Sequence, residues 1–256
     1  MPKDNLKPHT EKTWREPDAS RVQDLFGSIA ETYDVANDVM TLGLARLWRK
    51  KLVHWSGAKP ADKVLDCATG TGDLALEFKK AVGDTGSVIG SDFCQEMLDK
   101  APEKAKALNL DVKFEWADAM ALPYPDETFD VVSIAYGIRN VADVNKALSE
   151  MTRVLKPGGR LMILETGEIQ NPVLRMGIRF YFEKFVPRLG GWVSGRRDAY
   201  EYLQKSSGGF PSGRQFCEIL RAMKTGDHST FSNVEHRALM GGASFIYRAE
   251  KSIGNA

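Results

Sequence analysis

The stretch that decides the fold reads Lys63-Val-Leu-Asp-Cys-Ala-Thr-Gly-Thr-Gly-Asp73. Its first residues form a short apolar run typical of a buried strand, and a helical pattern begins at Leu74. Small residues fill the turn between them, and Gly70 and Gly72 allow backbone angles that are closed to other residues. Because such a turn ends a parallel strand and opens a helix, it predicts a ligand-binding crevice at the carboxyl end of that strand.

Two classes of cofactor use a turn of this kind. Residues 70–75 fit the loose dinucleotide pattern G-x-G-x-x-G/A, and Asp92 lies twenty residues beyond Gly72. The acid on the strand, Asp66, separates the classes, because it would attract the ammonium and sulfonium of S-adenosylmethionine and repel a pyrophosphate. We therefore expect S-adenosylmethionine, with a nicotinamide dinucleotide as the alternative, and the stretch resembles the first motif of class I S-adenosylmethionine-dependent methyltransferases. The residues assigned to the cofactor here are Asp66, Gly70, Thr71 and Gly72.

Composition limits the other function classes. At 256 residues the chain is long enough for one α/β domain with an insertion and short for two. A net charge of +1 argues against broad electrostatic binding to nucleic acid. Cys67, Cys94 and Cys217 lack metal-like spacing, so we predict reduced thiols and no metal site. With no signal-peptide core and no long apolar run, we expect a cytoplasmic protein, and keep peripheral contact with the inner face of the membrane as an alternative.

The chain divides into a short arm and one domain. Residues 1–20 are polar, carry prolines and lack periodicity, which predicts a flexible N-terminal arm. Residues 21–256 form the single domain. Within it, helical periodicity over 21–58 predicts a lid over the cofactor, and Tyr33 is expected to face the site.

Strands and helices alternate through the middle of the chain. Strands are predicted at 63–67, 87–91, 112–116, 131–135 and 160–165, and the helices between and after them at 74–81, 93–108, 144–154 and 212–223. This order predicts a doubly wound, Rossmann-like parallel sheet of the α/β class. Residues 232–238 and 244–250 read as an antiparallel C-terminal hairpin that closes the sheet.

Acids at two strand ends are the further candidates for cofactor binding. Asp92 closes the second strand and could accept hydrogen bonds from both ribose hydroxyls, with a helix N-cap as the alternative. Met97, on the helix that follows, is placed to touch the adenine. Asp118 follows the third strand and could accept from the adenine amino group, while Ala119 leaves room for the ring. The alternative for Asp118 is a solvated loop acid.

The segment after the fifth strand breaks the alternation. Residues 168–210 are rich in aromatic residues, and between Asn171 and Arg197 they carry six basic side chains against one acid. We predict a helical insertion that caps an apolar substrate or rests on an anionic membrane. Oligomer contacts or ordinary core packing with a basic rim is the alternative.

Several segments resemble one family, the ubiquinone/menaquinone-biosynthesis C-methyltransferases. The resemblance runs from Val22 to about Leu203. The segments that carry it are Tyr33-Asp-Val-Ala-Asn-Asp-Val-Met-Thr-Leu-Gly-Leu-Ala-Arg-Leu-Trp48, Gly137-Ile-Arg-Asn-Val141, Arg153-Val-Leu-Lys-Pro-Gly-Gly-Arg-Leu-Met-Ile-Leu-Glu165 and Asp198-Ala-Tyr-Glu-Tyr-Leu203. Departures from the family pattern stand at Ala36, Thr41, Ala45, Asp118, Ala135 and Gly167, and Ala135 occupies a cofactor-contact position that is often serine.

The resemblance implies methylation of a ring carbon of a polyprenylated benzoquinol or naphthoquinol. Arg139 would stabilise a phenolate, although a structural salt bridge is the alternative for this residue. The proton would leave through water held by Asn140 or Tyr33, or to a carboxylate such as Asp198. Partners kept open are a homo-oligomer and a quinone-biosynthesis complex. The alternative functions are methylation of another small phenol, sterol or amine, and a non-catalytic role in such a complex.

Overall fold

The computed structural model describes residues 18–169, 175–177, 202, 209–226 and 228–253. Most of the arm predicted at 1–20 and of the insertion predicted at 168–210 lies outside the described residues, as does Asp198. None of the helices in these described ranges is long and apolar enough to cross a bilayer. Nor do they bring together three or more His, Cys, Asp or Glu side chains that could hold a metal ion.

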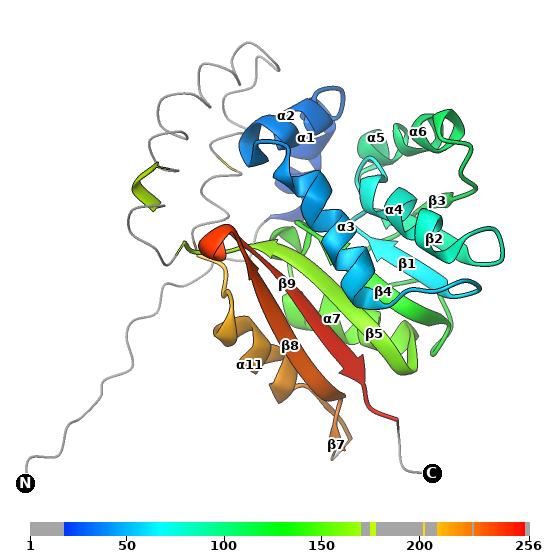
Figure 1. Ribbon diagram of the computed structural model, residues 1–256, viewed down its shortest axis with the longest axis vertical. Coiled ribbons are helices and arrows are strands. Elements are labelled where there is room, and N and C mark those ends of the chain that lie inside the picture. The colour runs from blue at the N-terminus through cyan, green and yellow to red at the C-terminus, as the bar shows by residue number, and fades with distance from the viewer. Residues whose placement is uncertain (1–17, 170–174, 178–201, 203–208, 227, 254–256) are drawn as a thin grey trace, which may run out of the picture.

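A mixed seven-stranded sheet forms the centre of the molecule (Figure 1), in the order β3-β2-β1-β4-β5-β9-β8. The first five strands in this order are parallel, and β9 pairs antiparallel with β5 and β8. This order confirms the predicted doubly wound sheet with an antiparallel hairpin at its end. The strands are β1 (Lys63–Cys67), β2 (Ser87–Asp92), β3 (Lys113–Trp116), β4 (Phe129–Ala135), β5 (Leu155–Thr166), β8 (Phe231–Leu239) and β9 (Ser244–Lys251).

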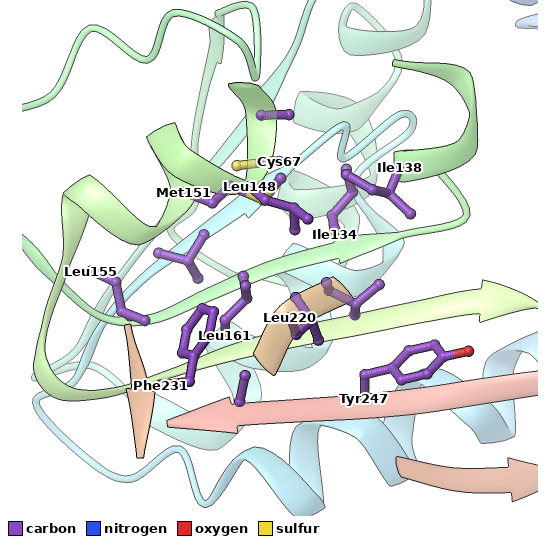
Figure 2. Packing of buried hydrophobic residues seen from close by; sticks show 14 of the residues in the cluster. Cys67, Ile134, Ile138, Leu148, Met151, Leu155, Leu161, Leu220, Phe231 and Tyr247 are labelled. Carbon is purple, nitrogen blue, oxygen red and sulfur yellow. The ribbon is translucent and has the colours of Figure 1, made fainter. Parts of the chain in front are cut away.

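Helices cover both faces of the sheet, because successive strand residues point to opposite sides. Val64 joins a buried cluster with Trp48 and Phe78, whereas Leu65 joins a cluster on the other face. Figure 2 shows part of the second cluster, where Leu148, Leu220 and Tyr247 are among the labelled side chains. The helices are α1 (Ala19–Ile29), α2 (Tyr33–Thr41), α3 (Leu44–Ser56), α4 (Asp73–Val82), α5 (Gln95–Leu98), α6 (Ala101–Ala107), α7 (Val144–Val154) and α11 (Arg214–Ala222), with 3-10 turns η1 (Ile138–Asn140) and η2 (Met240–Gly242). A two-stranded hairpin, β6 (Lys224–Thr225) with β7 (His228–Ser229), was not expected.

Two boundaries differ from the prediction. The single helix expected over 93–108 is wrong, because the chain forms α5 and α6 with a break between them. Pro102 explains the break, since its ring has no N–H to continue the α5 ladder and instead opens α6. Strand β5 begins at Leu155, earlier than expected, and runs through the proline–glycine segment 157–159. Its register against β4 shifts between Phe129 and Val131.

The site is positioned by the carboxyl ends of β1 and β4, which lie next to each other in the sheet. Each strand is followed by a non-glycine residue with positive φ, Ala68 at 47° and Tyr136 at 56°. A Cβ added at Gly137 would lie 2.6 Å from the Cβ of Ala68, so the two turns touch closely. Such backbone is costly and concentrates at functional sites.

Candidate active site

The turn after β1 is packed tightly against α6 and β3. Gly70 and Gly72 have φ of 57° and 85°, in the left-handed region where a side chain is strained. A Cβ at Gly72 would lie 2.9 Å from both the Cβ of Ala101 and the ring of Phe114. The turn therefore needs glycine at this position both for its backbone angle and for space.

Asp66 is a buried carboxylate held by neutral donors. It is 1% exposed, and its two oxygens accept from the hydroxyls of Ser133 and Thr69, each at 2.7 Å. Within the described part of the chain no basic side chain forms an ion pair with it. Burial raises the pKa of Asp66 to about 7, more than these hydrogen bonds lower it. A cationic ligand at this place would supply the missing positive charge.

Asp92 joins the glycine turn to the start of α5. One of its oxygens accepts from the backbone N–H of Gly70 at 2.7 Å, and the other from that of Cys94 at 2.9 Å. Burial raises the pKa of Asp92 to about 6. A carboxylate has lone pairs beyond these two bonds, so it can still accept from a ligand hydroxyl. The bond to Cys94 resembles the capping role considered for Asp92, and its ribose role remains a prediction.

Most of the predicted residues line one of two adjoining compartments. The first compartment is largely apolar, and it also receives Val22 and Phe26 from α1. The predicted residues that line it are Tyr33, Gly70, Asp92, Met97, Asp118, Ala119, Ala135 and Asn140.

The second compartment lies on the β1 side of the turn. It is lined by Arg49, Asp66, Thr69, Thr71 and Asp73, and shares Tyr33, Ala68, Ala135 and Tyr136 with the first compartment. Of the predicted residues that the structure describes, only Gly72 and Arg139 line neither compartment. The sequence reasoning missed Arg49, which no local motif marks.

Arg139 is buried in an ion pair. It is 5% exposed, and its Nη1 donates to Glu165 Oε1 at 2.6 Å and to the carbonyl of Tyr136 at 2.8 Å. This is the salt bridge considered as the alternative for Arg139, and its catalytic role stays a prediction. Asn140 does reach the first compartment, where its amide donates to the Tyr136 carbonyl at 3.2 Å and accepts from the hydroxyl of Tyr202 at 3.3 Å.

The other two predicted side chains of the first compartment have local bonds. Asp118 accepts from the backbone N–H of Met120 at 2.8 Å, a bond within its own loop. That bond fits the loop interpretation and leaves the second carboxylate oxygen for a ligand. Burial raises the pKa of Tyr33, whose ring meets that of Phe26 edge to face, with centroids 6.0 Å apart.

Helix α2, part of the predicted lid, is tied to the glycine turn by a small charged network. Asp34 at the start of α2 accepts from the hydroxyl of Thr71 at 2.6 Å. Lys104 of α6 forms an ion pair with Asp34 and donates to Thr71 Oγ1 and Asp73 Oδ1, each at 2.8 Å. Because Asp34 follows Tyr33, this network holds Tyr33 over the compartments. Sequence reasoning did not find Lys104, since it lies 33 residues beyond Thr71.

A glycine turn, two strand-end acids and an apolar compartment on this sheet define a nucleotide-binding α/β domain of Rossmann type. Solved structures agree in fold. A methyltransferase from Aquifex aeolicus described as dependent on S-adenosylmethionine is 23% identical, with a TM-score of 0.52 and coverage of 84% of this chain and 98% of that chain. The [4+2]-cyclase SpnF is 18% identical, with a TM-score of 0.61 and coverage of 94% and 98%. A fold shared with a cyclase does not by itself fix the reaction.

Sequence relatives decide the family. The model of the ubiE/COQ5 methyltransferase family matches residues 15–251, and the chain belongs to this family. The ubiquinone/menaquinone biosynthesis C-methyltransferase UbiE of Bdellovibrio bacteriovorus is 50% identical over 91% of this chain and 96% of the relative. The demethylmenaquinone methyltransferase of Deinococcus radiodurans is 41% identical over 90% and 92%. Together these matches confirm the resemblance read from the sequence.

Proposed function

We propose that this protein is an S-adenosylmethionine-dependent C-methyltransferase that methylates a polyprenylated quinol in ubiquinone or menaquinone biosynthesis. Membership of the ubiE/COQ5 methyltransferase family and the names of its relatives support the reaction class. The structural observation that carries the proposal is Asp66, a buried carboxylate without an ion-pair partner in the described part of the chain. Such a group fits a cofactor that brings positive charge.

The residues present fit this cofactor at both ends. Asp92 would accept from the ribose, Met97 and Ala119 would flank the adenine, and Asp118 would accept from its amino group. Asp66 would face the ammonium and sulfonium, Gly70 and Thr71 would form the floor, and Gly72 would set the turn from behind them. Ala135 supplies a wall to both compartments but no hydroxyl. When bound, the cofactor supplies an electrophilic methyl group.

The protein's own contribution to the chemistry is alignment and control of one proton. Holding a ring carbon in line with the methyl group removes much of the entropic barrier. The ring becomes a better nucleophile once its phenol, with an ordinary pKa of about 10, loses its proton. We assign Asn140 and Tyr33, which line the first compartment, to holding the water that takes this proton. Arg139 would stabilise the phenolate from behind Tyr136, whose carbonyl it binds.

The role of Arg139 has its own test. If the guanidinium stabilises the phenolate, Arg139→Lys should lower kcat much more than cofactor affinity, because the charge stays but the fork geometry is lost. Equal losses in kcat and in affinity, measured by steady-state kinetics and calorimetry, would assign Arg139 to binding or to structure alone.

The substrate is a benzoquinol or naphthoquinol with an apolar tail. Val22 and Phe26 of the lid line the first compartment and suit such a ring and tail. We propose a cytoplasmic protein that contacts the inner face of the membrane peripherally to reach this substrate. The basic, aromatic composition of residues 168–210 supports that contact. A homo-oligomer and a quinone-biosynthesis complex are the partners to test.

The experiment is direct. Purified protein is incubated with S-adenosylmethionine and either a demethylated benzoquinol or a demethylated naphthoquinol, and the quinols are analysed by mass spectrometry. The expected product is one methyl group heavier, with the label on carbon when the cofactor carries a labelled methyl. Quinone profiles of a deletion strain should show a species one methyl group short. Methylation of neither ring class, with folded protein that binds cofactor, would overturn the proposed substrate.

A further inference from the structure

We propose that Arg49 binds the carboxylate at the amino-acid end of the cofactor, and so selects adenosyl compounds that carry a complete amino acid. This inference rests on the proposed function and concerns the second compartment. Arg49 of α3 is distant in the sequence from Asp66 and Asp73, but it lines this compartment together with them. An amino acid presents an ammonium and a carboxylate on one carbon. A compartment that binds it needs an acid and a cation close together.

Arg49 supplies the positive charge of the second compartment. Among the described residues that line it, Asp66 and Asp73 bring carboxylates and Arg49 brings the permanent cation. Lys104 contacts Asp73 but does not line the compartment. Asp66 is therefore placed for the ammonium, and Arg49 for the carboxylate.

Four other nearby donors already have acceptors within the protein. The hydroxyl of Thr69 donates to Asp66, and the hydroxyl of Thr71 donates to Asp34. In the turn, the N–H of Gly70 donates to Asp92 and that of Gly72 donates to the carbonyl of Thr69. A ligand carboxylate bound by these groups would have to break an existing hydrogen bond. Arg49 imposes no such cost.

Arg49 is also held in place. The residue is 7% exposed, and its Nη2 donates to Asp73 Oδ2 at 2.6 Å. Asp73 in turn accepts from Lys104 at its other oxygen at 2.8 Å. A guanidinium has five N–H groups in a planar fork, and one of them meets a described residue here. The remaining N–H groups can meet both oxygens of a carboxylate without moving the side chain.

Calorimetry with matched ligands tests this assignment. S-adenosylmethionine and decarboxylated S-adenosylmethionine differ in the carboxylate alone. Wild-type protein should bind the complete cofactor roughly 10- to 100-fold more tightly, the range expected for a charge-assisted bidentate contact. Arg49→Met should weaken binding of S-adenosylmethionine by a similar factor and leave the decarboxylated compound nearly unchanged. Arg49→Lys should lie between wild type and Arg49→Met. The control is Lys50→Met, which removes an exposed charge from the next position of α3 and should change neither affinity.

Each outcome decides a separate question. Equal weakening of both ligands in Arg49→Met would mean that Arg49 acts through the fold, and would overturn the inference. Equal affinity of the wild-type protein for both ligands would overturn it without any variant, even if Arg49→Met fails to fold. Wild-type protein that binds no adenosyl compound would instead overturn the proposed function itself. Thermal unfolding of each variant shows whether its fold is intact.

Discussion

Two regions at the carboxyl edge of the sheet, the β1–β2 end and the β5 end, bury carboxylates in opposite ways. At the ends of β1 and β2, Asp66 and Asp92 accept hydrogen bonds from hydroxyls and backbone amides. At the end of β5, Glu165 is 0% exposed and is paired with the guanidinium of Arg139 at 2.6 Å. In the first arrangement no basic side chain of the described residues forms an ion pair with either acid, so each carboxyl either keeps its proton or is balanced by a cationic ligand. The second arrangement balances its charge inside the protein.

The difference separates binding from support at one edge of the sheet. Burial raises the pKa of Asp66 to about 7 and that of Asp92 to about 6, so both carboxyls titrate near neutral pH. Both line a compartment, whereas Glu165 and Arg139 line neither. We infer that the β1–β2 end is built to receive a cation, and that the Arg139–Glu165 pair at the β5 end holds the turn after β4 in place in addition to the phenolate role proposed for Arg139.

The largest effect is expected at the internally balanced end. Arg139→Met leaves Glu165 buried without its partner, and should lower the free energy of unfolding by roughly 3–5 kcal/mol. The control is Arg46→Met, which breaks an exposed ion pair with Asp38 and should cost about 1 kcal/mol or less. Urea unfolding measures both. Adding Glu165→Gln to Arg139→Met should restore part of the loss, and a small effect of Arg139→Met alone would contradict a supporting role for the pair.

At the ligand-facing end, Asp92→Ala should act first on binding. We expect cofactor affinity to fall by roughly 100-fold or more, because the ribose loses a charged acceptor. The fold should survive with a loss of about 1–3 kcal/mol, since the N–H groups of Gly70 and Cys94 lose their acceptor. Asp99→Ala, an exposed position just after α5, is the control. Unchanged affinity by calorimetry would remove the ribose role.

Sequence and structure agree on where the acids at the strand ends lie. Asp66 and Asp92 could be predicted because the carboxyl ends of parallel strands meet at one edge of the sheet, whatever the packing around them. Arg49 and Lys104 could not, because they come from α3 and α6 and reach the turn only through helix packing. Arg139 and Glu165 are 26 residues apart in the sequence, and no local pattern marked Glu165 as the partner of Arg139.

Two differences had a physical signal in the sequence. Pro102 is the signal for the break between α5 and α6, but the prediction over 93–108 used the apolar periodicity alone and did not consider it. Residues 157–159, Pro-Gly-Gly, are of the types that stop a helix and fit the end of α7 at Val154, yet they also lie within β5. A stop signal locates the end of one element and says little about where the next begins.

A third prediction uses pH to compare acids with and without a cationic partner. The pKa of Asp66 rises from an ordinary 3.8 to about 7 in the folded protein, so the folded chain keeps a proton that the unfolded chain has released. The free energy of unfolding should therefore fall as pH rises from about 4 to about 7. Asp66→Asn removes this penalty and should raise stability by roughly 1–3 kcal/mol at pH 8, while weakening cofactor binding.

The matched control lies just before the same strand. Asp62 is also buried, but it pairs with Arg160 at 2.8 Å. Asp62→Asn should lower stability at pH 8, because the guanidinium loses its partner. Denaturant unfolding at pH 4, 6 and 8 compares the two variants. Asp66→Asn that is no more stable than wild type at pH 8 would show that the carboxylate is balanced within the protein after all.

The smallest effect is expected at the connection between the ligand-facing end and α2, which belongs to the predicted lid. Lys104 joins Asp34 of the lid to Thr71 and Asp73, and a partly exposed network of this kind contributes about 1 kcal/mol. Lys104→Met should weaken cofactor affinity a few-fold and speed amide hydrogen exchange in α2, because the lid opens more often. Lys106→Met, which changes an exposed lysine on the same helix, should do neither.

If Lys104→Met lowered affinity with unchanged exchange in α2, the lysine would act on the glycine turn through Thr71 and Asp73 and not on the lid. In that case the position of α2 would depend on the bound cofactor and not on the ion pair between Lys104 and Asp34. The lid would then resemble the β1–β2 end, which a ligand completes, and not the β5 end, which is balanced within the protein.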